Sequence, residues 1–188
     1  MKLNFCSQCG NGLTCKIPDN DNRLRHVCAA CNTIHYQNPR MVVGCLPIWQ
    51  EKVLLCRRAI APRQGFWTLP AGFMETGEST LDGAMRETWE EALAKVENAQ
   101  LYRLFDLPHI NQVYIFYRAE LVDGEFGIGH ESLETRLFEE REIPWHQLAF
   151  PIVGETLSDF FRERQHGAFS VRIGVSELDE TSWIKHAK

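Results

Sequence analysis

The chain has 188 residues, 44% hydrophobic and 24% charged, and a formal net charge of −5. This composition excludes disordered, collagen-like and low-complexity proteins, and it predicts one domain, with or without a small additional module. The longest apolar run, Met41–Trp49, is far shorter than the ~20 residues of a membrane span, and the N-terminus lacks a secretory signal. We therefore expect a cytoplasmic protein that does not interact with membranes.

The first 40 residues carry five Lys or Arg against two Asp, a local balance of +3 in an acidic chain. Four cysteines in this region form two pairs, Cys6-x2-Cys9 and Cys28-x2-Cys31. Two Cys-x2-Cys turns can direct four thiolates to one point, which predicts a structural Zn2+ site with no open position. The alternatives are two disulfides or four unrelated thiols. Cys45 and Cys56 lie in apolar runs and are expected to be core residues.

After a short linker, the chain alternates between strand and helix patterns. Met41–Trp49 and Lys52–Arg57 are predicted strands of one hairpin, and Phe66–Leu69 is a shorter strand. Ile152–His166 is a predicted amphipathic helix that stops at Gly167. Further strands are expected at 100–107, 112–121 and 136–139, with an edge strand at 171–175. This order predicts a mixed α/β body with helices on both faces of its sheet.

A second helix is predicted to start at Ser79, where Ser79-x-x-Asp82 has the spacing of a capping box. With 100° per residue, the buried stripe is predicted to consist of Leu81, Ala84, Met85, Thr88 and Ala92. Three glutamates, Glu87, Glu90 and Glu91, then share the face beside that stripe. Clustered carboxylates suit Mg2+ or Mn2+, although a solvated acidic face would show the same pattern.

The sequence around this helix resembles the Nudix box, the signature of the Nudix hydrolase superfamily. The matching positions are Gly72, Glu78, Arg86-Glu87 and Glu90-Glu91. The segment Leu69–Phe73, which contains Gly72, fits the same family. Over residues 4–151 the chain resembles zinc-ribbon Nudix proteins, which include the plant plastid FAD pyrophosphatase and its bacterial relatives. One position departs from the box, because Leu93 stands where a helix-ending glycine is expected.

The resemblance implies a zinc ribbon at 1–37 and a Nudix α/β/α sandwich with a mixed sheet at 38–188. It also implies metal-dependent hydrolysis of a small-molecule dinucleotide, either FAD to FMN and AMP or ADP-ribose to AMP and ribose 5-phosphate. Glu87, Glu90, Glu91 and the Gly72 carbonyl would then bind Mg2+ or Mn2+. An ion pair between Glu78 and Arg86 would hold the preceding loop against the helix.

Family members usually take another base or metal ligand from outside the box. Glu134 is the first candidate here and Glu131 the second, and a solvated loop acid is the alternative for each. Arg58 is a candidate phosphate-binding residue, or else a surface arginine at a strand end. Trp67, Tyr114 and Tyr117 are candidates for stacking on adenine or flavin, or else core aromatics, and Trp67 and Tyr114 are the preferred two.

A competing hypothesis is a nucleic-acid-binding or regulatory protein that uses the zinc ribbon and keeps the Nudix fold as a ligand sensor. The net charge and the intact glutamates make nucleic acid an unlikely partner. A third hypothesis gives the ribbon a role in forming a homodimer or in covering the substrate. The motif that marks NADH pyrophosphatases is absent downstream of the box, which argues against reduced nicotinamide dinucleotides and NAD-capped RNA.

Overall fold

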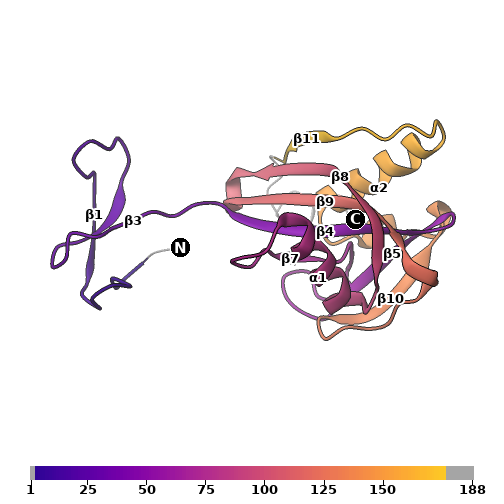
Figure 1. Cartoon of the computed structure of the whole chain (residues 1–188), viewed down its shortest axis with the longest axis horizontal. Coiled ribbons are helices and arrows are strands. Elements are labelled where there is room, and N and C mark those ends of the chain that lie inside the picture. Colours follow the sequence, from indigo (N-terminus) through magenta and orange to yellow (C-terminus); the bar gives the residue numbers. More distant parts are fainter. Residues whose placement is uncertain (1–2, 177–188) are drawn as a thin grey trace. The chain divides into compact units, whose positions relative to one another are not determined.

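The computed structural model describes residues 3–176 (Figure 1). The chain divides into two compact units, Met1–Asn38 and Pro39–Lys188. Within the described residues, neither helix is both long and apolar enough to cross a lipid bilayer.

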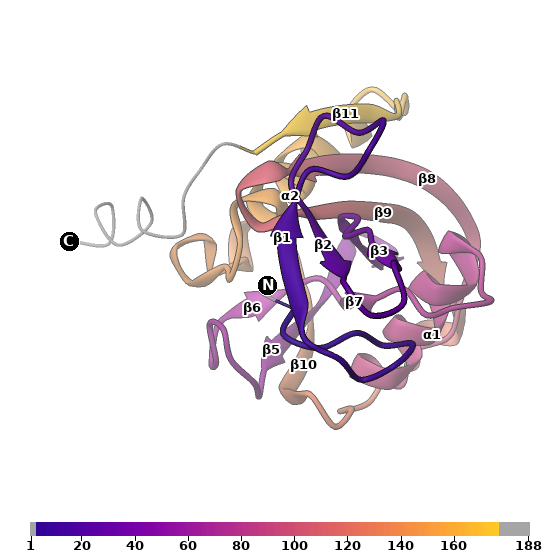
Figure 2. The ribbon, with the colours of Figure 1, turned by 90° about the vertical axis from the view of Figure 1, so that its left-hand side faces the viewer.

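The N-terminal unit is a small antiparallel sheet of three strands, visible in Figure 2. Its strands are β1 (Leu13–Lys16), β2 (Arg25–Cys28) and β3 (Ile34–His35), in the order β1-β2-β3. Among the described residues of this unit, the buried apolar side chains are Cys6, Pro18, Val27 and Cys28. Such a small core cannot stabilise a unit of this size by itself, so a further stabilising element is required.

The second unit is built on a mixed sheet in the order β10-β5-β4-β9-β8-β11, with β6 paired to β5 and β7 to β4. The β4–β9 and β11–β8 pairs are parallel, and the other pairs are antiparallel. The strands are β4 (Arg40–Trp49), β5 (Lys52–Arg58), β6 (Trp67–Thr68), β7 (Ala71–Phe73), β8 (Val96–Leu107), β9 (Gln112–Leu121), β10 (Ser132–Phe138) and β11 (Arg172–Val175).

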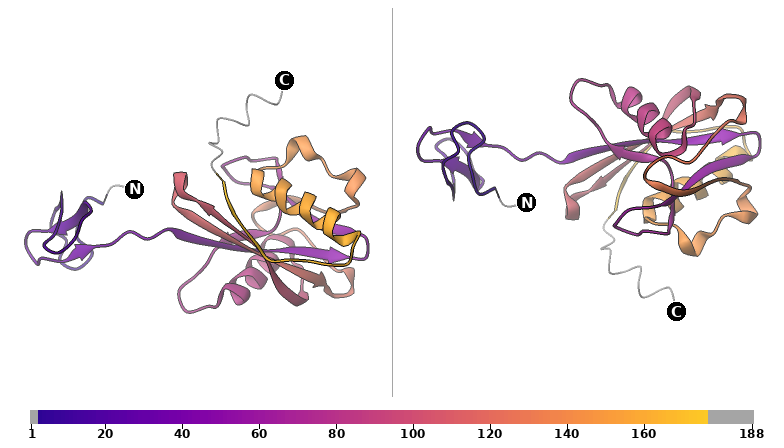
Figure 3. Two further views of the ribbon diagram at one scale, coloured as in Figure 1. Left: turned by 90° about the horizontal axis from the view of Figure 1, so that it is seen from above. Right: turned by 90° about the horizontal axis from the view of Figure 1, so that it is seen from below.

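Two α-helices, α1 (Thr80–Ala92) and α2 (Pro151–Arg164), lie on opposite faces of this sheet (Figure 3). Each helix covers its own apolar core, and the side chains of β5 alternate between them. Val53 and Leu55 pack in the core with α2, whereas Leu54 and Cys56 pack in the core with α1. Short 3-10 turns occur at Pro108–Ile110, Val122–Gly124, Glu140–Glu142 and Trp145–Gln147. The predicted α/β/α sandwich with a mixed sheet is confirmed.

Two predicted strands are longer than the sequence pattern indicates. The strand β8 begins at Val96, not at residue 100, because register shifts near residues 97–103 interrupt the alternation of its side chains. The strand β10 begins at Ser132, not at residue 136; three of its first four residues are polar, so their pattern resembles a loop. The edge strand predicted at the tail is confirmed as β11, which pairs in parallel with β8.

Candidate active site

The two ends of α1 are fixed by local contacts. Ser79 is the N-cap, and its hydroxyl oxygen accepts a hydrogen bond from the Asp82 amide at 3.1 Å. At the other end, Leu93 takes the left-handed conformation, with φ 47° and ψ 33°, and its amide donates to the Trp89 carbonyl at 2.8 Å. The helix therefore stops where the glycine of the box would stop it, although a leucine occupies this unfavourable backbone region.

The buried face of α1 is rotated toward the glutamates relative to the predicted stripe. The buried residues are Gly83, Ala84, Thr88, Glu91 and Ala92. The prediction was wrong for Met85, which is 38% exposed, and Leu81 is only partly buried. The cause is tertiary, because α1 packs against β4 and β7 and thereby presents Glu91 to the interior.

The three glutamates of α1 differ in their surroundings. Glu91 is 6% exposed, Glu87 is largely buried and Glu90 is exposed. Burial raises the pKa of Glu91 to about 8, and the neighbouring charge of Glu87 adds to this rise. Burial also raises the pKa of Glu87, despite a hydrogen bond from Arg86. Buried carboxylates that repel one another are suited to a divalent cation, which would favour their charged forms.

Arg86 ties the loop before α1 to the glutamates of the helix. Its Nε and Nη2 donate to the two carboxylate oxygens of Glu78 at 3.0 and 2.8 Å, forming the expected ion pair. Its Nη1 donates to Glu87 and Glu90 at 2.8 and 3.1 Å, and its Nη2 also reaches the Phe73 carbonyl. The hydrogen bonds from Arg86 lower the pKa of Glu78 to about 2. One guanidinium thus connects β7, the following loop and α1.

Gly72 lies in β7 against the carboxylate of Glu87. A Cβ atom at this position would overlap that carboxylate and lie 2.5 Å from its Oε1. In the same strand, the Ala71 amide donates to Glu91 Oε2 at 3.4 Å. A side chain at residue 72 would therefore displace the carboxylate of Glu87 from its place against β7.

These groups line a cavity of about 1260 Å3, which is larger than the roughly 300–1,000 Å3 of a typical small-molecule site. Its acidic lining consists of Glu75, Glu87, Glu90, Glu91 and Glu131. Cationic and aromatic groups also line the cavity; they include Arg40, Arg58, Arg63, Phe73, Tyr114, Phe116 and Phe150. This combination suits a ligand with an anionic group and a planar ring.

The two acids expected from outside the box lie in different places. Glu131 lines the cavity, and its charge contributes to the raised pKa of Glu87 and Glu91, after the larger effect of burial. Glu134 is absent from the described lining, because in β10 it lies opposite Arg57 and forms an ion pair with it at 3.7 Å. The structure therefore reverses the order of preference and favours Glu131.

Arg58 lies in the cavity wall, where its guanidinium is 5.2 Å from the centre of the Phe150 ring. Its Nε donates to the Pro62 carbonyl at 2.9 Å, which leaves its other nitrogens for further contacts. Sequence reasoning missed Phe150 and Arg40. Phe150 lies just before α2, and Arg40 is the first residue of β4. No local sequence pattern marks such positions as part of a site.

The aromatic candidates also separate in the structure. Trp67 was a wrong prediction for stacking on a ligand, because its ring is buried in the core of α2 and packs edge-on against Phe138 at 4.9 Å. Tyr114 lines the cavity and lies 6.0 Å from the Phe116 ring. Tyr117 lies on the other side of the sheet, where its hydroxyl is 2.6 Å from Thr80 Oγ1.

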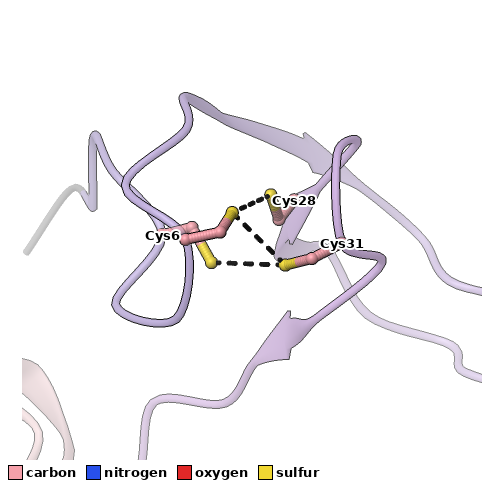
Figure 4. A group of neighbouring side chains, drawn as sticks. Cys6, Cys28 and Cys31 are labelled. Carbon is pink, nitrogen blue, oxygen red and sulfur yellow. Dashed lines mark hydrogen bonds between the residues drawn. The ribbon is translucent and has the colours of Figure 1, made fainter.

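The four predicted zinc ligands cluster in the N-terminal unit. Their sulfur atoms all lie within 4.8 Å of one another, and three pairs are 3.4–3.6 Å apart: Cys9 with Cys28, Cys9 with Cys31, and Cys6 with Cys31. Figure 4 shows the side chains of Cys6, Cys28 and Cys31 converging. A Zn2+ with Zn–S bonds near 2.3 Å places its ligands roughly 3.8 Å apart, so this cluster fits the metal after small shifts. His35 Nε2 lies 3.3 Å from Cys6 Sγ.

A mixed sheet between two helices, with a glutamate-bearing helix along one cavity, defines a Nudix fold. Comparison with family models shows that the chain belongs to the Nudix family: residues 38–160 match the NUDIX domain, and residues 4–37 match the Nudix N-terminal zinc ribbon. The resemblance drawn from the sequence is therefore confirmed.

Individual relatives extend this comparison. A NUDIX hydrolase of known structure from Nitrosomonas europaea is 52% identical, with a TM-score of 0.89, and the match covers 93% of this chain and 99% of that one. The NAD-capped RNA hydrolase NudC of Vibrio parahaemolyticus is 27% identical over 86% of this chain and 62% of its own length. The ADP-ribose pyrophosphatase of Methanocaldococcus jannaschii is 29% identical over 61% of this chain and 69% of its own length. The chain spans between about half and two thirds of the NudC relatives it matches.

Proposed function

We propose that this protein is a metal-dependent pyrophosphatase that hydrolyses a nucleoside diphosphate linked to a second moiety. One observation carries the proposal: Glu87, Glu90 and Glu91 all line one cavity, which is large enough for a dinucleotide. The hard oxygens of these carboxylates, together with the Gly72 carbonyl as a further ligand in this proposal, suit Mg2+ or Mn2+ and not a soft metal. When bound, such an ion neutralises the diphosphate and lowers the pKa of bound water.

The remaining residues of the site have separate roles in this proposal. Glu78 holds Arg86, and Arg86 in turn orients Glu87 and Glu90 through its hydrogen bonds. Glu131 acts as the additional base or metal ligand from outside α1. Arg58 binds a phosphate oxygen, because its guanidinium lies in the cavity wall and can donate to an anion.

Two substrates lead the proposal. ADP-ribose is supported by the relative named ADP-ribose pyrophosphatase, and FAD by the resemblance of the sequence to zinc-ribbon FAD pyrophosphatases. Tyr114 and Phe150 provide aromatic surface for the planar ring of either substrate. NAD-capped RNA is named for the NudC relatives, of which this chain spans only part, and it is therefore a competing substrate in the test.

For the N-terminal unit we propose a structural Zn2+ held by Cys6, Cys9, Cys28 and Cys31. The spacing of the sulfur atoms supports this assignment, and four thiolates leave no position for a substrate. The metal would replace the apolar core that this unit lacks.

The decisive experiment is product analysis with Mg2+ or Mn2+ and a panel of substrates: FAD, ADP-ribose, NADH, NAD+, diadenosine polyphosphates and NAD-capped RNA. We expect AMP as one product from FAD or ADP-ribose, and no product with Glu91→Gln. Glu97→Gln, an exposed glutamate on β8, is the matched control and should retain activity. Lack of turnover on the whole panel would overturn the proposal, and a salt-dependent complex of the inactive protein with RNA would then favour the nucleic-acid-binding alternative.

A further inference from the structure

The loop between β9 and β10 completes the C-terminal end of α1. The last carbonyl groups of a helix have no partner within the helix. Here the Gly127 amide donates to the Ala92 carbonyl at 2.6 Å, and the Gly129 amide donates to the Glu91 carbonyl at 3.0 Å. The loop therefore satisfies carbonyls of the same helical turn that carries Glu90 and Glu91.

Gly129 makes the closest approach in this contact. A Cβ atom at Gly129 would overlap the carbonyl oxygen of Glu90 and lie 2.7 Å from the carbonyl carbons of Glu90 and Glu91. The obstacle is backbone on the helix side, so no side-chain rotation can relieve it. Any side chain at this position must push the loop away from α1.

The residues that follow Gly129 enter the cavity. His130 and Glu131 both line it, beside the glutamates of α1. Two further backbone hydrogen bonds hold this short segment. The Ala59 amide donates to the Glu131 carbonyl at 2.8 Å, and within the segment the Ser132 amide donates to the Gly129 carbonyl at 3.1 Å. The position of Glu131 thus depends on how closely Gly129 approaches the helix.

We infer that Gly129 is a positioning residue, whose missing side chain lets the loop dock on α1 and keeps Glu131 in the cavity that Glu87 and Glu91 also line. This inference rests on the role proposed for Glu131. It assigns no chemistry to Gly129 itself. It does make the geometry of the site depend on two segments that are 40 residues apart in the sequence, since Glu91 and Glu131 belong to one cluster.

The test is a double-mutant cycle with Gly129→Ala and Glu131→Gln. We expect Gly129→Ala to lower kcat and the affinity for Mn2+ by roughly 10- to 100-fold, the range seen when groups that orient metal ligands are changed. In the Glu131→Gln background, the same substitution should change kcat and Mn2+ affinity less than threefold. Gly154→Ala in α2 is the matched control, because its Cβ would meet only Leu148 Cδ1 at an ordinary 3.5 Å.

Several outcomes would overturn the inference. They are wild-type kcat and Mn2+ affinity in Gly129→Ala, or losses of equal size with and without Glu131, which would indicate a general structural defect. Mn2+ binding, measured by calorimetry, tests the inference even if no substrate is turned over, so failure of the proposed function is distinguishable. If Gly129→Ala does not fold, the cycle is run with Gly127→Ala in the same loop, whose Cβ would press on the side chain of Leu93, with Cδ1 nearest at 3.0 Å.

Discussion

Arg103 holds a buried cluster of charges between β8 and α2, and its removal gives a sharp test of the packing. Its Nε and Nη2 donate to Asp159 Oδ2 at 3.0 and 2.8 Å, and its Nη2 also donates to Glu163 Oε1 at 3.2 Å. Its Nη1 donates to the carbonyls of Tyr102 and Ser170. The side chain of Arg103 is 1% exposed. Replacing it with Met leaves two carboxylates in the interior without their main partner.

Removal of one partner from a buried ion pair destabilises proteins by about 3–5 kcal/mol. Arg162 and Arg172 contact the same two carboxylates and partly compensate. We therefore expect Arg103→Met to lower the free energy of unfolding by about 3 kcal/mol, at the lower end of that range. For a unit of this size, the corresponding fall in Tm is roughly 6–12 °C.

The loss should depend on pH, with a definite sign. Burial would raise the pKa of Glu163, but hydrogen bonding from Tyr102 and the charge of Arg103 outweigh it, so the pKa is lowered. A carboxyl group with a lowered pKa in the folded state stabilises the protein above its unfolded pKa of about 4.3, and this stability is lost as the pH falls through the folded value. The difference between wild type and Arg103→Met should therefore be largest near neutral pH and shrink in acid.

Urea unfolding from pH 7 down to about pH 2, followed by circular dichroism, measures both quantities, because the range extends below the unfolded pKa of about 4.3. The control is Arg141→Met, since Arg141 is 83% exposed in its ion pair with Glu139 and should contribute little. A variant as stable as wild type at pH 7 would refute the assigned role of Arg103. A loss that stays constant across the pH range would assign the effect to packing, not to charge.

Three further predictions concern the cavity and the ribbon. Glu91→Gln should abolish turnover, with a loss beyond the roughly 100-fold typical of outer-shell changes. Without metal, Tm should stay equal or rise, because burial raises the pKa of Glu91 to about 8 and Gln avoids the cost of protonating that carboxylate on folding; calorimetry checks this second part. Trp67→Ala should lower the free energy of unfolding by about 3–5 kcal/mol, whereas Tyr114→Ala should mainly raise KM. If Trp67→Ala instead raised KM and left stability unchanged, Trp67 would lie at the ligand. Cys9→Ser should eliminate bound zinc, measured by atomic absorption, and unfold the N-terminal unit, while the thermal transition of residues 39–176 persists.

Much of the fold follows from local patterns in the sequence. Short apolar runs identify β4, β5 and β9, and Ser79 marks the start of α1, because such runs and helix capping depend only on neighbouring residues. The spacing of the four cysteines likewise indicates a single cluster of thiolates. The order of Gly72, Glu78, Arg86 and the three glutamates was sufficient to identify the family, since the motif is local.

Other features depend on contacts between distant segments. Packing on β4 and β7 sets the rotation of α1 about its axis, which buries Glu91 and exposes Met85. A helical wheel drawn from the sequence cannot predict this rotation, because it includes no contact with other elements. The choice of Glu131 over Glu134 depends on the register of β10 against β5, where Glu134 meets Arg57. Burial of Trp67 beneath α2 is also tertiary, since a tryptophan in a short strand suits a core and a ligand platform equally. The sequence by itself determined which groups the protein carries, and the tertiary structure decided which of them face the cavity.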